Sequence, residues 1–448
     1  MPVAWWTSPA IFRPLALTEP SGPATPSAPP GAGSGASLRQ YLLVTASYWG
    51  FTLSDGALRM LVLLHFFKLG FSPFTLAFLF LLYEAAGIVA NLLGGWLATR
   101  FGIPRMLQLG LITQVLGLLM LSAVSMDWTL WLSVAWVVVA QGICGVAKDL
   151  TKTASKSAIK LTAGEASGRL FAWVAWFTGS KNAMKGVGFF IGGLLLDQLG
   201  FQWALWSIAA ALGLVWLGVV VTLPVQLGKA KASKSAKELF SKSRALNLLA
   251  TGRMALFGAR DVWFVVGVPV FLYSSGWSFT MVGSFMAAWT IGYGFVQAVA
   301  PAMVSKSTDG LSREVPAAQA WGLALSLVPL GLAALMWAEP SHIDWWVVGV
   351  LGVFGFFFAV NSSVHSYVVL AYAGSEKAAE DVGFYYAANA AGRFIGTLLS
   401  GLLYQWGGLQ ACLLGSFAML LLCTMVSARL PKTRENPPDC HGSVTKPL

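Results

Sequence analysis

The sequence predicts an all-α membrane protein with twelve transmembrane helices in two pseudo-symmetric six-helix bundles. Three observations lead to this fold class: the composition, a series of apolar runs about one bilayer long, and an internal repeat. Of the 448 residues, 56% are hydrophobic and only 10% are charged. Soluble chains are about 25% charged, so a soluble fold of this size could not bury so much apolar surface.

Twelve apolar runs follow one another along the chain. At about 1.5 Å per residue, each is long enough to cross a hydrocarbon core of about 30 Å. We expect them at 41–67, 74–98, 106–124, from 128 onward, 170–199, 203–223, 245–272, 279–304, 317–336, 345–372, 383–406 and 409–428. These runs divide the chain into a disordered extension (1–37), an N-terminal bundle (38–226), a basic linker (227–244), a C-terminal bundle (245–430) and a tail (431–448).

The charges of the connecting loops predict the topology. The segment Gly228–Arg244 contains six basic residues and a single acid, Glu238, and basic residues also gather in alternate connections. By the positive-inside rule these connections, and with them both termini, are expected in the cytosol. The same rule explains most of the net charge of +11, so no nucleic-acid partner is needed. The four cysteines form no CxxC pair and no metal-ligand spacing.

The two halves of the sequence can be aligned as a repeat. Asp55 and Asp261 lie 206 residues apart (261 − 55), and the offset later becomes 208 (401 − 193). A two-fold repeat around a linker indicates a transporter whose site lies between the halves. At these offsets the matched residues are Gly70 with Gly276, Phe71 with Trp277, Ser72 with Ser278, Asn91 with Gln297, Lys181 with Asn389, Lys185 with Arg393, Gly188 with Gly396, Gly193 with Gly401, Gly200 with Gly408 and Gln202 with Gln410.

The fifth apolar run carries two lysines near its middle. Lys181 and Lys185 lie one helical turn apart, and Asn182 lies between them. A lysine ammonium at the bilayer centre costs about 2.5–3.5 kcal/mol on insertion scales. We therefore expect this helix to line a pore and to present positive charge to an anion.

Charged residues also occur in the first and seventh runs. Asp55 and Arg59 are spaced i,i+4 and can pair on one helix face. They either neutralise each other structurally, or Arg59 binds the anion while Asp55 releases it or carries a proton. Arg260 and Asp261 are adjacent and should point about 100° apart, so we expect Arg260 to face the substrate and Asp261 another helix. Arg253 is expected nearer the cytosolic mouth.

The fourth run ends in a stripe of lysines that begins with Lys148 and Lys152 and continues to Lys156 and Lys160. These lysines either snorkel at the cytosolic interface or face the substrate path, and Asp149 and Glu165 are the only nearby acids. In either position the stripe would attract anions to an inward mouth.

Two further runs contribute polar candidates. Glu84 has no obvious partner in its own helix, and it could carry a proton or pair with a lysine across the path. In the tenth run, Asn361 and His365 can form hydrogen bonds, and His365 is either packed in place or a proton relay. The candidate substrate-binding residues are Arg59, Lys148, Lys152, Lys181, Asn182, Lys185, Arg260, Asn361, Asn389 and Arg393, and the candidates for proton coupling or ion pairing are Asp55, Glu84, Asp149, Asp261 and His365.

Several stretches resemble known transporter families. GGWLATRFGIPR (Gly94–Arg105) resembles the loop signature between the second and third spans of the major facilitator superfamily, with Thr99 in place of its usual acid. Four other stretches resemble the ArsJ-type organoarsenical efflux permeases, and this resemblance covers about residues 38–430. They are YWGFTLSDGALRMLVLLHF (Tyr48–Phe66), AKDLTKTASKSAIK (Ala147–Lys160), TGSKNAMKGVGFF (Thr178–Phe190) and FGARDVWFVVGVPVFLY (Phe257–Tyr273).

The resemblance implies export of 1-arseno-3-phosphoglycerate across the inner membrane of a bacterial cell. This ester forms when arsenate replaces phosphate in a glycolytic dehydrogenase, so the implied metabolic partner is a glyceraldehyde-phosphate dehydrogenase.

The residues themselves predict a transporter of a multiply charged anion and leave the direction of transport open. An importer or exchanger of ordinary phosphate esters would use the same basic residues. A receptor or structural protein is disfavoured, because it would not need buried charges at matched positions. No P-loop, HExxH motif or GxSxG elbow occurs, so we expect no enzymatic activity, no cofactor and no metal. A proton gradient is the expected energy source, and the expected functional unit is a monomer in the lipid bilayer.

Overall fold

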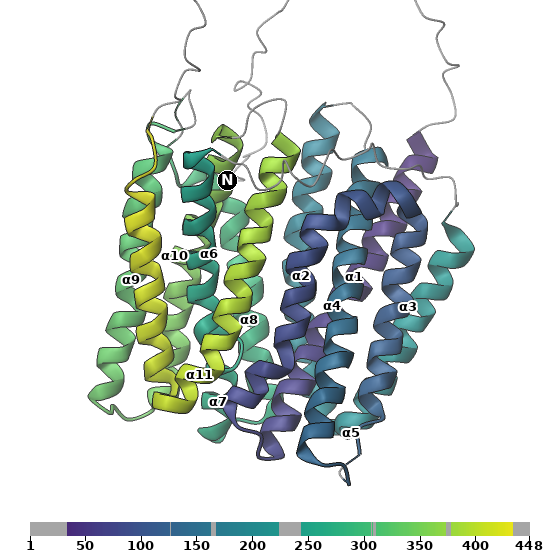
Figure 1. Ribbon diagram of the computed structural model, residues 1–448, viewed down its shortest axis with the longest axis horizontal. Helices are drawn as coiled ribbons and strands as arrows, with labels where there is room; N and C mark the ends of the chain where they lie inside the picture. The colour runs from purple at the N-terminus through teal and green to yellow at the C-terminus, as the bar shows by residue number, and fades with distance from the viewer. Residues whose placement is uncertain are drawn as a thin grey trace, which may run out of the picture.

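The computed structural model describes residues 34–125, 127–162, 167–223, 243–305, 307, 311–372 and 378–432, and within these ranges it is helical with no strand. The predicted N-terminal extension, basic linker and C-terminal tail lie almost wholly outside the described residues. The helices stand side by side across the molecule (Figure 1). They are α1 (Ser34–Lys68), α2 (Pro73–Phe101), α3 (Ile103–Ser122), α4 (Leu130–Thr162), α5 (Ser167–Thr222), α6 (Arg244–Phe264), α7 (Gly267–Ser274), α8 (Phe279–Val299), the short 3-10 helix η2 (Ala300–Ala302), α9 (Glu314–Trp337), α10 (Ile343–Tyr372) and α11 (Ala378–Ser427).

Ten stretches of the described chain are long and apolar enough to cross a bilayer. The stretches in α5 and α11 contain 43 and 44 residues, which at about 1.5 Å per residue is roughly twice the thickness of a hydrocarbon core. Each contains a glycine with non-helical backbone angles, Gly200 with φ 75° and Gly408 with φ 63°. In Figure 1, α11 turns back at the lower edge of the molecule. Each long helix therefore supplies two spans, and the predicted total of twelve is confirmed.

The seventh predicted span, 245–272, is present as Arg244–Ser274, but its helix breaks between α6 and α7. Pro269 lies four residues after Val265, and its ring would clash with the Val265 carbonyl in a continuous helix. The hydroxyl of Ser400 in α11 accepts hydrogen bonds from the backbone N–H groups of Val266 and Gly267, at 3.1 and 3.2 Å. The backbone N–H groups freed by the break thus find a hydrogen-bond acceptor on a neighbouring helix.

Matched residues of the repeat have the same backbone role in both halves. Gly70 and Gly276 end the first and seventh spans with φ of 86° and 91°, a region that glycine adopts without steric cost. Ser72 and Ser278 are the N-caps of α2 and α8. Each side chain accepts a hydrogen bond from the backbone N–H three residues later, at 3.2 and 3.1 Å. The repeat in the sequence is therefore a repeat in the structure.

The two halves meet at the lower edge of Figure 1 through a pair of symmetry-related contacts, which we call the seam. A Cβ atom on Gly193 in α5 would lie 2.3 Å from the carbonyl oxygen of Phe279, at the start of α8. A Cβ atom on Gly401 in α11 would lie 2.4 Å from the carbonyl oxygen of Pro73, at the start of α2. Phe279 and Pro73 are also matched by the repeat (279 − 73 = 206), so the same close contact is made twice.

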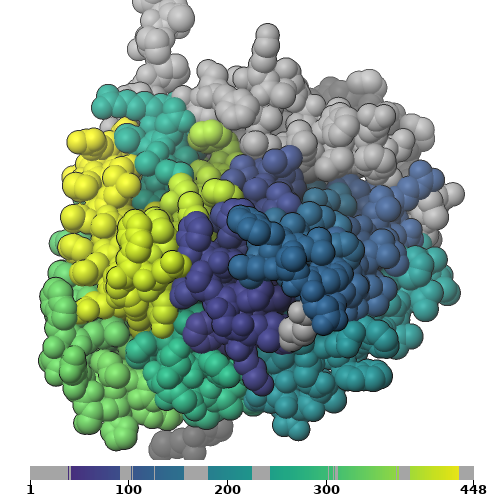
Figure 2. Space-filling view, turned by 60° about the horizontal axis from the view of Figure 1, so that its bottom comes forward, coloured from purple at the N-terminus to yellow at the C-terminus, as the bar shows by residue number. Residues whose placement is uncertain are grey.

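Two side chains extend the seam in the same symmetric way. The carboxylate of Asp197 accepts a hydrogen bond of 2.7 Å from the backbone N–H of Thr280, and another from its hydroxyl. The side-chain carbonyl of Gln405 accepts a hydrogen bond of 3.2 Å from the backbone N–H of Phe74. Figure 2 brings this edge forward and shows residues of α2 directly against residues of α11. The seam therefore holds α5 to α8 and α11 to α2.

Burial is distributed as expected for a protein surrounded by lipid. Trp263 is fully buried and packs edge-on against Trp289 and Phe354 in the C-terminal half. Large apolar side chains also remain exposed, among them Trp131 at 82% and Leu214 at 71%. A soluble protein would bury such residues, whereas helices in a bilayer direct them toward lipid.

Candidate functional site

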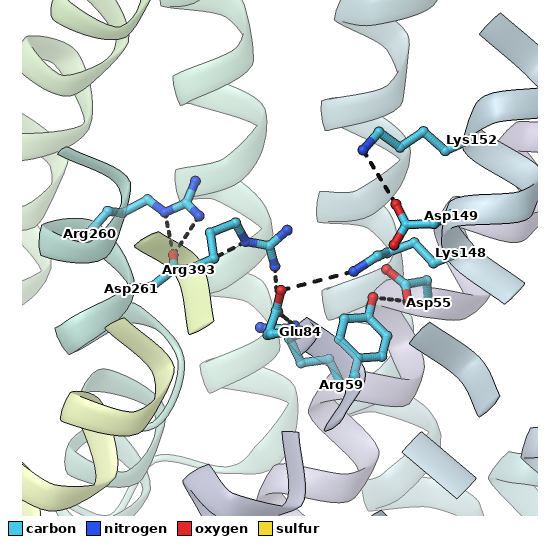
Figure 3. Close-up of polar contacts among 10 residues, drawn as sticks. Asp55, Arg59, Glu84, Lys148, Asp149, Lys152, Arg260, Asp261 and Arg393 are labelled. Atoms are coloured by element: carbon cyan, nitrogen blue, oxygen red, sulfur yellow. Dashed lines mark hydrogen bonds and ion pairs between the residues drawn. The ribbon is translucent and has the colours of Figure 1, made fainter. Parts of the chain in front are cut away.

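Glu84 in α2 is the centre of a charge network that joins the two halves (Figure 3). Its carboxylate accepts hydrogen bonds of 2.6 Å from Arg59 in α1 and 2.6 Å from Arg393 in α11. The ammonium nitrogen of Lys148 in α4 lies 4.0 Å from its second oxygen. The Glu84 side chain is only 1% exposed, and a carboxylate buried so completely requires charged partners. Because Arg393 belongs to the C-terminal half, the two halves share this carboxylate.

Arg393 connects Glu84 to a second carboxylate. Its Nε atom lies 3.2 Å from Asp261 Oδ2 in α6. The other oxygen of Asp261 pairs with the neighbouring Arg260, at 2.6 Å from Nε and 2.5 Å from Nη2. A Cβ atom on Gly396 would lie 2.9 Å from the Cβ of Asp261. The absence of a side chain at Gly396 therefore lets α11 approach α6 closely enough for this network to form.

The network has more positive than negative charge. The cations Arg59, Lys148, Arg260 and Arg393 share the two carboxylates Glu84 and Asp261, which leaves a net charge of 4 − 2 = +2. Asp55 and Lys185, which lie beside the network, add one charge of each sign and leave this sum unchanged. The carboxylates are 1% exposed, whereas Lys148, Arg260 and Arg393 keep 14–20% of their side chains exposed. The acids are thus enclosed, and part of each of these three cations remains accessible.

A tyrosine that sequence reasoning missed ties the network to Asp55. The hydroxyl of Tyr83 donates a short hydrogen bond to Asp55. Its ring lies 3.8 Å from the ammonium nitrogen of Lys148 and 5.3 Å from the guanidinium carbon of Arg59, which are cation–π distances. The available signal was its position directly before Glu84 in an otherwise apolar run. Tyr83 therefore orients an acid and two cations at once.

The predicted pore-lining lysine Lys185 lies near this network. The charged side chains of Arg393, Arg59, Asp55 and Arg260 lie close enough to interact electrostatically with its ammonium group. Among the described residues Lys185 makes no ion pair within 4.0 Å, and its nitrogen lies 5.5 Å from the ring of Phe189. It thus differs from the four cations of the network, each of which is held by a carboxylate.

Other predicted residues lie around the network. Lys152 pairs with Asp149 at 3.4 Å in α4. Asn182 in α5 donates a hydrogen bond of 3.3 Å to Gln297 in α8, across the two halves. Lys181 is partly exposed in α5, and Asn389 is partly exposed in α11. These residues surround the same interface.

One predicted pairing is wrong and one expectation is met only in part. Asp55 and Arg59 do not pair with each other, because Asp55 accepts a hydrogen bond from Tyr83 and Arg59 donates to Glu84. Asp261 contacts Arg393 of another helix as expected, but Arg260 also pairs with Asp261, because its long guanidinium side chain bends back to its neighbour.

Arg253, which was expected nearer the cytosolic mouth, has a buried side chain that is 4% exposed. Its guanidinium donates to the carbonyl and the hydroxyl of Ser362, at 2.9 and 3.1 Å. Asn361 and His365 are fully buried in α10 beside it. No contact joins these two candidates to Glu84. The predicted loop signature 94–105 and the lysines Lys156 and Lys160 fall largely on side chains outside the described part of the chain.

A helical membrane protein with two pseudo-symmetric halves, and with charges shared between those halves, is a membrane transporter by its architecture. The sequence profile of the Major Facilitator Superfamily matches residues 41–380. The chain belongs to this superfamily.

Solved structures agree with this fold. The chain is similar to a POT family transporter in complex with 5-aminolevulinic acid, at a TM-score of 0.70 and 14% identity over 88% of this chain and 96% of that one. It is similar to the nucleoside transporter NupG at 0.67 and 15%, over 88% and 99%, and to a D-xylose–proton symporter at 0.66 and 14%, over 89% and 98%. No curated protein matches the sequence.

Proposed function

We propose that the protein is a secondary transporter that exports a multiply charged organic anion from the cytosol, with 1-arseno-3-phosphoglycerate as its substrate. The observation that carries the proposal is the net charge of +2 in the network around Glu84. An anion with at least two charges would balance this excess, whereas a sugar or a nucleoside would leave it unpaired at a high cost in a bilayer.

The kinds of cationic side chain in the network support a substrate that carries a phosphoryl or arsenyl group. Arg59, Arg260 and Arg393 each present a planar fork that can bond two oxygens of a phosphate, an arsenate or a carboxylate. Lys185 adds a point charge without an ion pair among the described residues. On binding, the anion would compete with Glu84 and Asp261 for these donors, and Lys185 would contact it directly. Protonation of a displaced carboxylate would couple export to a proton gradient.

The arsenate ester, as distinct from an ordinary phosphate ester, is supported by the four stretches that resemble the ArsJ-type permeases. The alternative is an exchanger of phosphate esters such as 3-phosphoglycerate. We further propose a bacterial inner-membrane location, cytosolic termini, a monomeric unit and a glyceraldehyde-phosphate dehydrogenase as the source of the substrate.

The test replaces Lys185 by glutamine. Lys185→Gln should leave the protein level unchanged or higher and should abolish export, because the variant removes a buried charge together with an anion contact. Lys185→Arg should be partly active at best, because its reach and geometry differ. The control is Lys432→Gln at an exposed position. Cells that make the arsenate ester should lose arsenate resistance with Lys185→Gln and keep it with the control, and arsenite tolerance should not change.

The outcomes separate the two candidate substrates. Resistance to arsenate without uptake of 3-phosphoglycerate into proteoliposomes would support the arsenate ester. Uptake of 3-phosphoglycerate without arsenate resistance would favour the exchanger. Normal export by Lys185→Gln at wild-type abundance would place the anion site elsewhere, and the lysines of α4 would become the leading candidates.

A further inference from the structure

Arg253 in α6 is a buried cation that no described carboxylate neutralises. Its side chain is 4% exposed. Its polar contacts among the described residues are the carbonyl and hydroxyl oxygens of Ser362, at 2.9 and 3.1 Å, and its Nε atom has no hydrogen-bond acceptor. By contrast, the arginines around Glu84 all pair with acids. A guanidinium charge in the membrane-spanning part of a protein requires compensation.

The aromatic neighbours of Arg253 compensate its charge only in part. The guanidinium carbon lies 4.1 Å from the ring centre of Phe257 and 5.0 Å from that of Tyr385. Ring faces attract a cation, but they cannot accept the in-plane N–H group at Nε. One positive charge and one donor therefore remain.

The residues next to Arg253 have unused hydrogen-bonding groups. Asn361 and His365 are both 0% exposed, and neither the amide of Asn361 nor either ring nitrogen of His365 has a hydrogen-bond partner in the described structure. They are spaced i,i+4 and therefore share one face of α10. The amide nitrogen and one imidazole nitrogen can donate hydrogen bonds. Several donors thus accompany a single uncompensated cation.

Two glycines lie beside these donors. A Cβ atom at Gly252 in α6 would lie 3.4 Å from His365 Cε1, an ordinary contact distance, so a methyl-sized space is present there. A Cβ atom at Gly322 in α9 would lie 3.5 Å from Asn361 Nδ2 but only 3.0 Å from Thr424 Oγ1.

The region is enclosed by α6, α9, α10 and α11, and it borders the central network at Phe257, whose ring centre lies 4.1 Å from the guanidinium carbon of Arg253 and 5.0 Å from that of Arg260. The exposure of 4% or less at Arg253, Asn361 and His365 admits only a small occupant and excludes a lipid headgroup or the organic substrate.

We propose that Arg253, Asn361 and His365 bind a small monovalent inorganic anion, such as chloride, at a site separate from the central network. The anion supplies the missing negative charge and accepts the free N–H groups. A single charge matches the single uncompensated guanidinium. The site is independent of the proposed substrate and stabilises the packing of four helices in the C-terminal half.

The test compares thermal unfolding of the purified full chain in sodium chloride and in sodium gluconate at equal ionic strength. Because a ligand that binds the folded state stabilises it, the wild type should unfold at least about 2 °C higher in chloride. Arg253→Gln should lose this difference. Arg429→Gln, an exposed arginine of the same half, should keep it, and so should Lys185→Gln, which alters only the central site.

A second measurement does not depend on a stable variant. Crystals of the wild type grown in sodium bromide should show an anomalous peak beside Arg253. No chloride effect in the wild type, an unchanged effect in Arg253→Gln, or no bromide beside Arg253 would each overturn the proposal, and the region would then hold water alone. Loss of the chloride effect in Lys185→Gln would instead place the anion in the central network and would also overturn it.

Discussion

The seam and the charge network occupy the same interface between the halves, yet only the seam follows the two-fold repeat of the sequence. In the seam, Gly193 and Gly401 make equivalent contacts, and Asp197 and Gln405 accept hydrogen bonds at equivalent places. In the network the equivalence fails. Glu84 corresponds to Thr290 (84 + 206), so the central carboxylate occurs in one half only.

This difference indicates that the seam serves the movement of the halves and that the charge network serves substrate binding. Alternating access rocks one half against the other, and repeated contacts let both halves open and close by the same geometry. The organic anion proposed as substrate has no two-fold symmetry, so a site for it would have no reason to repeat. The matched charges Asp55 and Asp261 show the same divergence, because one accepts from a tyrosine and the other from two arginines.

The largest expected effect concerns Glu84. Glu84→Gln leaves Arg59 and Arg393 without their shared carboxylate, and breaking a buried ion pair in this way costs about 3–5 kcal/mol. We expect export to fall to background and the unfolding temperature to drop. The matched control is Thr290→Val at the equivalent position. The Thr290 hydroxyl is buried without a hydrogen-bond partner, so this change should be neutral or slightly stabilising. Thermal unfolding and vesicle transport of both variants measure the difference.

Equal losses in the two variants would contradict the asymmetry of the network. A stable and fully active Glu84→Gln protein would show that Arg59 and Arg393 do not depend on this carboxylate. The proton-coupling role proposed for Glu84 would then fall as well.

Most of the fold could be predicted from the sequence, because each part rests on a local signal. Span length follows from the bilayer, and the matched positions of Gly200 and Gly408 follow from the repeat. The break before α7 was missed although Pro269 is a local signal for it. The acceptor of the freed N–H groups, Ser400, lies 131 residues later (400 − 269). A sequence pattern within one helix contains no information about such a partner.

The site was predictable by residue type but not by pairing. Buried charges are costly in a membrane, so the sequence could identify Arg59, Glu84, Lys185, Asp261 and Arg393 as residues with a purpose. Their partners depend on how helices far apart in the chain face one another. The i,i+4 rule therefore suggested a contact within α1 that the structure replaces with contacts to α2.

The next largest effect concerns the glycines of the seam. An added methyl group at Gly193 or Gly401 would lie 2.3–2.4 Å from a backbone oxygen, so the helices must move apart, at a cost of about 1–3 kcal/mol. Gly193→Ala and Gly401→Ala should destabilise the closed seam by similar amounts. The control is Gly349→Ala in α10, where the methyl group meets nothing within 4 Å and should stabilise the helix slightly. A cysteine that replaces Asn182 should react faster with a labelling reagent added on the seam side in Gly193→Ala and Gly401→Ala only. If just one of them responds, the two contacts are not equivalent in the moving protein.

The smallest effect distinguishes the two polar contacts of the seam. Asp197 and Gln405 both accept a hydrogen bond from the first turn of a helix in the other half. Asp197 is the stronger acceptor, because its negative charge lies at the positive end of the α8 dipole and because it also bonds the Thr280 hydroxyl. We expect Asp197→Ala to lower stability by about 1 kcal/mol and Gln405→Ala by about half as much.

Asp197→Asn keeps an acceptor without the charge and should resemble Gln405. High salt should reduce the gap between Asp197→Ala and Gln405→Ala, because it screens the charge term alone. Thermal unfolding of the three variants at low and high salt measures this, and a gap that does not depend on salt would show that the extra hydrogen bond, not the charge, makes the two sides unequal.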